Sequence, residues 1–152
     1  MMVTFFDSRG IIHREFISTG QTVTADVYIA VLDRLFKRIA RGRPEMWQDK
    51  TFFCCMTAPA HTATRVVQFL AKKGITVLSH PPYSPDLSPP DYFFFPKLKL
   101  EMKGDRYDTI DDIQAAETRK LKVIPPEAFA TAMECLLDRA KKCIEVQGDY
   151  FK

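Results

Sequence analysis

Two short stretches of the chain hold the residues whose types could do chemistry. Residues 58–63 carry His61, and residues 80–92 carry His80 and Asp91. A histidine can exchange protons or contact a phosphate, and a carboxylate is a preferred ligand of hard divalent cations such as Mg²⁺. Asp91 is therefore the first candidate for a metal ligand, and two roles stay open for His61 and His80: contact with a phosphate, or a hydrogen-bonded structural role.

Asp91 also has a purely structural interpretation. Ser88-Pro89-Pro90-Asp91 has the pattern of a helix start, with Ser88 as N-cap, proline at the first helical position and a carboxylate facing the positive end of the helix. Asp86, five residues earlier, is expected to brace the proline-rich loop rather than to bind metal. The residues alone leave both interpretations of Asp91 open.

The elements that would position these residues follow from hydrophobic spacing. A hairpin is predicted from strands at 2–6 and 11–17, and buried strands are predicted at 51–56 and 75–78. Helices are predicted from Thr24 to about Ala40, over 62–73, from near Pro89 to Met102, from Thr109, and from Pro125. A hairpin followed by alternating helices and strands predicts an α/β fold with a mixed sheet covered by helices, and this pattern leaves the sheet one strand short.

Helical spacing also predicts which side chains face inward. The helix over 62–73 should bury Val66, Val67, Leu70 and Ala71; the helix from Thr109 should bury Ile110, Ile113, Ala116 and Leu121; and the last helix should carry a buried stripe of Phe129, Met133, Leu136, Ala140 and Ile144. His13 is expected to be exposed, Trp47 to plug the core, and the basic cluster of Arg34, Lys37, Arg38, Arg41 and Arg43 to be a solvated surface.

Composition excludes several classes of protein. The chain has 152 residues, 46% of them hydrophobic and 27% charged, with a net charge of +3, which suits one folded domain and argues against disorder. It contains no apolar run of the roughly 18–20 residues that span a bilayer and no signal peptide at its start, so a soluble intracellular protein without a membrane partner is expected. The four cysteines match no zinc spacing, and Cys135 and Cys143 are expected to be buried thiols.

The same stretches, Ala58-Pro59-Ala60-His61-Thr62-Ala63 and His80-Pro81-Pro82-Tyr83-Ser84-Pro85-Asp86-Leu87-Ser88-Pro89-Pro90-Asp91-Tyr92, resemble the catalytic core of mariner-type DNA transposases of the Tc1/mariner superfamily. FFDSRG near the start, RPEMW, FPKLK and GDYF also look like that family, so the resemblance covers essentially the whole chain. The motifs are similar, too, to the transposase half of SET-methyltransferase–mariner fusions.

The resemblance implies an RNase H-like fold in which three carboxylates hold two Mg²⁺ or Mn²⁺ ions for DNA cleavage and strand transfer. Asp91 matches the third family carboxylate. In mariner elements thirty-four residues separate the second from the third, and counting back reaches Met56. The family's His-Asp-Asn-Ala sequence against Cys55-Met56-Thr57-Ala58 gives the same register. Because a neutral thioether does not replace a carboxylate on Mg²⁺, we expect no productive metal binding and a lost cleavage activity.

The remaining expectations also rest on the resemblance. Residues 1–152 are interpreted as a partial catalytic domain, without the first catalytic strand and without the helix-turn-helix DNA-binding domains that precede it in the family. Weak, nonspecific DNA contact is expected through Lys97, Lys99, Lys103 and His61, and the implied location is the nucleus. The three lysines are equally explained as a solvated helix face. Self-association is expected from unpaired strand edges. Three functions stay open: an active nuclease, a non-catalytic DNA- or protein-binding module, and a remnant without a selected role.

Overall fold

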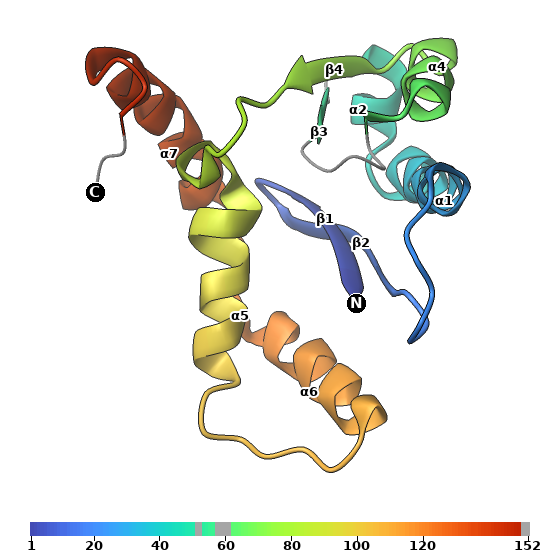
Figure 1. Cartoon of the computed structure of the whole chain (residues 1–152), viewed down its shortest axis with the longest axis vertical. Helices are drawn as coiled ribbons and strands as arrows, with labels where there is room; N and C mark the ends of the chain where they lie inside the picture. Colours follow the sequence, from blue (N-terminus) through green and yellow to red (C-terminus); the bar gives the residue numbers. More distant parts are fainter. Residues whose placement is uncertain (51–52, 57–61, 150–152) are drawn as a thin grey trace. The chain divides into compact units, whose positions relative to one another are not determined.

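A computed structural model describes residues 1–50, 53–56 and 62–149 of the chain (Figure 1). Contacts group these residues into two compact units. The first comprises Met1–Phe5 and Ile11–Pro82, and the second comprises Phe6–Gly10 and the chain from Tyr83 onward.

Over its described residues, the first unit combines two small sheets with helices α1, α2 and α4. Strands β1 (Met2–Asp7) and β2 (Gly10–Phe16) form a hairpin, of which residues 6–10 belong to the second unit, and β3 (Phe53–Met56) pairs in parallel with β4 (Thr76–Ser79). The register of the parallel pair runs from Phe53 opposite Thr76 to Met56 opposite Ser79. The predicted α/β class is confirmed, although the described strands form two two-stranded sheets rather than one mixed sheet.

Helix α1 (Ala25–Gly42) organises the core of the first unit. Its start follows the sequence prediction, since the Thr24 side chain accepts a hydrogen bond of 3.4 Å from the Val27 amide. Helices α2 (Pro44–Asp49) and α4 (Thr64–Lys72) pack on α1, beside β3 and β4 (Figure 1). The buried core consists of Tyr28, Leu32, Leu35, Phe36, Ile39, Val66, Leu70 and Ile75.

Three features of the first unit differ from the sequence prediction. Helix α2 is additional, because Pro44 does not simply end the preceding helix but occupies the first turn of a new one. On α4, Val66 and Leu70 are buried but Val67 and Ala71 are exposed, since Phe69 packs against the core instead. Strand β4 is mostly exposed rather than buried, because it pairs only with β3 among the described strands.

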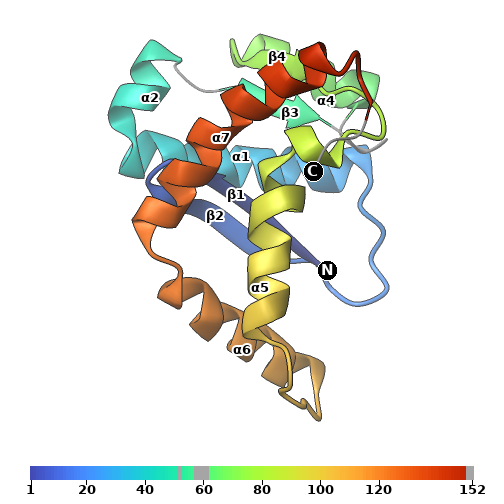
Figure 2. The same ribbon diagram turned by 90° about the vertical axis from the view of Figure 1, so that its left-hand side faces the viewer.

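The second unit is largely helical. A short 3₁₀ turn, η1 (Pro85–Leu87), precedes a π-helical turn, η2 (Pro90–Phe94), which continues directly into α5 (Phe95–Glu101). The chain then loops back as α6 (Ile110–Val123), which packs on α5, and continues as α7 (Pro126–Glu145) (Figure 2). None of the described helices is long and apolar enough to cross a membrane.

Helix α6 begins as the sequence predicts. The Thr109 side chain accepts a hydrogen bond from the Asp112 amide, and the Asp112 carboxylate accepts one from the Thr109 amide, which completes a capping box. Its predicted inward face is only half right, because Ala116 and Leu121 are buried while Ile110 and Ile113 are exposed.

Candidate active site and neighbouring side chains

Asp91 lies in the first turn of η2 and is exposed. The Ser88 carbonyl accepts hydrogen bonds from the amides of Asp91 (2.9 Å) and Tyr92 (3.0 Å). No side chain caps this turn, so the predicted capping box is wrong: the Ser88 backbone holds the turn, and Ser88 itself is buried. Within the described residues the Asp91 carboxylate has no hydrogen-bond or ion-pair partner, which leaves it available to a ligand.

The turn that carries Asp91 is tied to α7 through its neighbour Tyr92. The Tyr92 hydroxyl donates a hydrogen bond of 2.6 Å to the Ala132 carbonyl, and the Arg139 guanidinium lies 4.2 Å from the centre of the Tyr92 ring. Burial raises the pKa of the Tyr92 hydroxyl, so it stays protonated as a donor. Arg139 also pairs with Asp86 at 4.0 Å, which agrees with the predicted bracing role of Asp86.

A cluster of aromatic rings holds the other side of the same turn. Phe94 is fully buried and stacks on Phe6 with ring centres 5.3 Å apart. Phe129 of α7 makes edge contacts with Phe6 at 5.5 Å and with Phe93 at 5.4 Å. Because these rings fill the interior of the second unit, the backbone position of Asp91 is fixed by packing on one side and by the Tyr92 hydrogen bond on the other.

Met56 is the last residue of β3, and Ser79 is its partner at the end of β4. Because the two strands are parallel, their carboxyl ends share one edge of the sheet, and that edge carries a thioether residue and a hydroxyl residue rather than a carboxylate. His61, predicted to contact DNA, lies outside the described residues.

The three predicted DNA-binding lysines do not all lie on one helix. Lys97 is half-buried in α5, Lys99 is exposed near the end of α5, and Lys103 is exposed in the turn that follows the helix. Within the described chain no carboxylate pairs with any of the three. Lys99 and Lys103 therefore present exposed cations after the Asp91 turn, whereas the side chain of Lys97 is partly buried.

The described donor groups do not match the two-cation centre that the resemblance implies. Among residues 1–50, 53–56 and 62–149, no three His, Cys, Asp or Glu side chains come together as a metal site would require. Asp91 offers a single free carboxylate, and two-metal phosphoryl-transfer sites need several hard oxygen ligands. The residues that the structure describes therefore do not fit such a centre.

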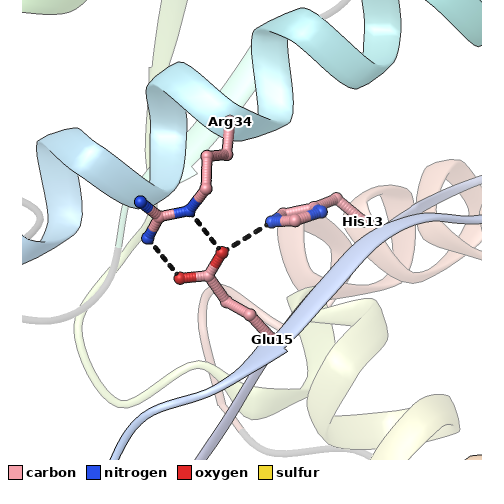
Figure 3. Close-up of polar contacts among 3 residues, drawn as sticks. All are labelled: His13, Glu15 and Arg34. Carbon is pink, nitrogen blue, oxygen red and sulfur yellow. Dashed lines mark hydrogen bonds and ion pairs between the residues drawn. The ribbon is translucent and has the colours of Figure 1, made fainter.

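A second polar cluster, which the sequence did not predict, lies in the first unit (Figure 3). Glu15 accepts hydrogen bonds from Arg34 Nε at 2.8 Å and from Arg34 Nη2 at 2.6 Å, and its other partner is His13 Nε2 at 2.8 Å. The prediction that His13 is exposed is wrong, since only 8% of the residue is accessible. Arg34 lowers the pKa of Glu15, so the carboxylate is ionised and His13 Nε2 must be the donor.

The alternation of β2 could have revealed half of this cluster. His13 and Glu15 are two residues apart on one strand, so their side chains share a face. Arg34 comes from α1, nineteen residues further along the chain, and no local pattern indicates that contact. The cluster ties β2 to α1, and its contribution is to the stability of the first unit.

A groove of about 400 Å³ lies between η2 and α7 in the second unit. Its lining includes Tyr92, Phe93, Ala132, Cys135 and Arg139. Cys135 and Cys143 are half-buried rather than buried, because α7 turns only part of its surface inward. The groove is lined mainly by apolar side chains and does not bring together the carboxylates that phosphodiester cleavage requires.

Comparison with known proteins places the chain in a family. Residues 2–114 match the family of DDE superfamily endonucleases, so the chain belongs to that family. Its fold matches that of the RNase H-like catalytic domain of the Mos1 mariner transposase, and its similarity to mariner-type transposases confirms the family resemblance that the sequence motifs predicted. It is 30% identical over 152 residues to human histone-lysine N-methyltransferase SETMAR, covering 99% of this chain and 22% of SETMAR.

The mariner Mos1 transposase of Drosophila mauritiana is 29% identical over 154 residues, which covers all of this chain and 45% of Mos1. A structure of the Mos1 catalytic domain with raltegravir and Mg superposes with a TM-score of 0.90 at 28% identity, covering 99% of this chain and 76% of that one. The Mos1 paired-end complex with the left transposon end gives a TM-score of 0.91 at 29% identity, covering 99% and 44%. The chain thus spans less than half the length of these curated relatives.

Proposed function

We propose that this chain is a mariner-like transposase catalytic domain that contacts DNA without cutting it. The observation that carries the proposal is Met56 at the carboxyl end of β3, the position that the spacing from Asp91 assigns to the second family carboxylate. We further propose that residues 1–152 carry only part of the catalytic domain, and that the protein acts in the nucleus, where its DNA would be.

The chemistry of the replaced position supports the loss of activity. Mg²⁺ and Mn²⁺ select hard oxygen ligands, and the sulfur of methionine is soft and uncharged. Asp91 would still offer one carboxylate to a cation, and the structure of the Mos1 domain with Mg supports Mg²⁺ as the ion to test. One carboxylate cannot position two cations on both sides of a phosphorus, so in-line displacement has no template.

Contact with DNA is supported by charge and exposure. Lys99 and Lys103 are exposed and follow the Asp91 turn, and residues 57–104 carry 6 Lys+Arg against 3 Asp+Glu. Mos1 has been solved with its transposon end, which makes DNA the first partner to test for this chain. Because the lysines would meet phosphates and not bases, binding should be weak, independent of sequence and steeply dependent on salt.

Cleavage and binding are tested on the same preparation. We expect no nicking of supercoiled plasmid with Mg²⁺ or Mn²⁺, and measurable binding of fluorescent duplex DNA at low salt that fades as salt rises. Nicking by the unmodified chain that Asp91→Asn abolishes would refute the loss of activity. Nicking that survives Asp91→Asn would indicate a contaminating nuclease, and the preparation would be repurified before scoring.

A matched pair of variants locates the DNA contact. Lys99→Glu should weaken binding about tenfold at low salt, because it removes one phosphate contact and adds repulsion. Lys122→Glu changes an exposed lysine near the end of α6 and is the control. An equal loss in both variants would mean that only net charge matters, and it would contradict the assignment to the end of α5.

A further inference from the structure

Two polar side-chain atoms of the hairpin formed by β1 and β2 are buried without a hydrogen-bond partner. They are Thr4 Oγ1 and Arg14 Nη1, and among the residues that the structure describes they are the buried side-chain nitrogen and oxygen atoms in this condition. A buried donor without an acceptor is costly, and a buried guanidinium without a counter-charge costs more. Such atoms are rare in folded proteins, so a partner of matching chemistry is expected for this pair.

The threonine and the arginine stand opposite each other on one face of the hairpin. The Ile17 amide donates a hydrogen bond of 2.7 Å to the Met1 carbonyl, which fixes the pairing of the strands at the open end of the hairpin. Counting inward from that pair places Phe5 opposite His13, and their rings stack with centres 6.5 Å apart. The same count places the threonine opposite the arginine, on the other face because side chains alternate along a strand. Theirs is a non-hydrogen-bonded pair, in which opposite side chains lie closest.

The carboxylates nearest to this pair in the hairpin have other partners. Glu15 follows Arg14 in the strand, so it lies on the opposite face, where it binds Arg34 and His13 (Figure 3). Asp7, at the end of β1, accepts a hydrogen bond of 2.8 Å from a backbone amide of the turn. Within the described chain the Arg14 guanidinium makes no ion pair or hydrogen bond, so its charge is not balanced by a neighbouring carboxylate.

We propose that Thr4 and Arg14 form a binding site for a small oxyanion, such as a phosphate or a carboxylate ion. A guanidinium offers only donors and a threonine hydroxyl can also donate, so the group that satisfies both must accept hydrogen bonds. An oxyanion accepts through several oxygen lone pairs and supplies the negative charge that the guanidinium requires. Each residue as a whole is partly exposed, which gives a small ion access from solvent. The inference does not depend on whether the chain binds or cuts DNA.

The test compares thermal melting of the whole chain in sodium chloride, phosphate and acetate at neutral pH and equal ionic strength. An oxyanion that binds the folded chain with a millimolar dissociation constant should, at about 100 mM, raise the melting temperature by about 3–8 °C above its value in chloride. Phosphate also stabilises proteins in general, because it is excluded from their surfaces. The specific effect is therefore the part of the increase that variants of the site lose.

Two variants remove the donors while keeping side chains of similar size. Arg14→Met should lose the whole specific effect, and Thr4→Val should lose at least half of it, because the hydroxyl supplies one of the contacts. In chloride, Arg14→Met should melt no lower than the unmodified chain, since it removes a buried charge that has no partner there. Arg38→Met is the matched control: Arg38 is an exposed arginine of α1, and its variant should keep the full effect.

Each outcome decides the proposal. A specific effect that is lost in Arg14→Met and reduced in Thr4→Val, but kept in Arg38→Met, supports it. A response to phosphate alone would assign a tetrahedral ligand to the supported site, and a response to acetate alone would assign a planar carboxylate. Equal effects in all four proteins would overturn the proposal, because they would be general effects of the salt. A lower melting temperature of Arg14→Met in chloride, or its failure to fold, would also overturn it, since Arg14 would then have a partner inside the protein.

Discussion

Replacing Glu15 by alanine should destabilise the first unit more than its surface location suggests. Glu15 accepts two hydrogen bonds from Arg34 and one from the buried His13 (Figure 3). Its own side chain is only 19% accessible, while that of Arg34 is 51% accessible. The substitution removes all three bonds and leaves a buried imidazole without its acceptor.

The size of the effect follows from these exposures. The half-exposed Arg34 fork is screened by water and contributes about 0.5–1 kcal/mol. The bond from His13 contributes about 1 kcal/mol, and leaving its nitrogen unpaired inside the protein costs roughly another 1 kcal/mol. The total is about 2.5–3 kcal/mol, which for a chain of this length lowers the melting temperature by roughly 5–12 °C.

Thermal melting followed by circular dichroism at neutral pH measures this loss. Asp33→Ala is the control. Asp33 also pairs with a cation of α1, Lys37 at 2.8 Å, but both side chains are exposed and lie one turn apart on the same helix. The control should melt close to the unmodified chain. If Glu15→Ala lowered the melting temperature as little as Asp33→Ala does, the inference that the bond from the buried His13 makes the Glu15–Arg34 pair more stabilising would be refuted.

Three further outcomes can be checked with the same equipment. The pKa of Glu15 is lowered from 4.5, chiefly by the hydrogen bond from Arg34. Its contribution to the free energy of unfolding is therefore complete above about pH 4.5 and is lost as the pH falls through the lower folded pKa. In Glu15→Gln the free energy of unfolding should depend less on pH in this window, which urea titrations at stepped pH would measure. Tyr92→Phe should cost about 1 kcal/mol, because it removes the bond to the Ala132 carbonyl, and equal urea midpoints would contradict that bond. Thr109→Ala should cost about 1 kcal/mol by removing the α6 cap, whereas Thr109→Ser should retain stability.

Local signals predicted the helices well where the capping residue and the apolar spacing agreed. Helix α1 starts after Thr24 and buries Val31, Leu32, Leu35 and Ile39, as the spacing indicates. Helix α6 starts with the Thr109 capping box for the same reason. Both features are decided within one or two turns of chain, so the sequence contains what is needed to predict them.

Contacts made at long range were not predicted. The burial of His13 depends on the Glu15–Arg34 pair, which joins a strand to a helix. The choice of Phe69 over Val67 on α4 depends on stacking against the ring of Phe36. Periodicity gives the direction of an apolar face only to within about one residue position, so neighbours such as Val67 are easily assigned to the wrong side. On α7 only Phe129 of the predicted stripe is buried; Met133, Leu136 and Ala140 are partly exposed and Ile144 is exposed, because an apolar spacing does not show how far the neighbouring elements extend along the helix.

The candidate site shows the same difference between local signals, which the sequence contains, and long-range contacts, which it does not. The sequence motifs identified Asp91 and the family, and the structure adds that Asp91 is exposed on a turn held by Tyr92 and by buried phenylalanines. None of these supports requires Asp91 to be a metal ligand, since packing and one hydrogen bond hold the turn in place. We therefore expect Asp91→Asn to leave both the melting temperature and DNA binding close to those of the unmodified chain. A large loss of DNA binding that Mg²⁺ modulates would show instead that Asp91 still works through a cation.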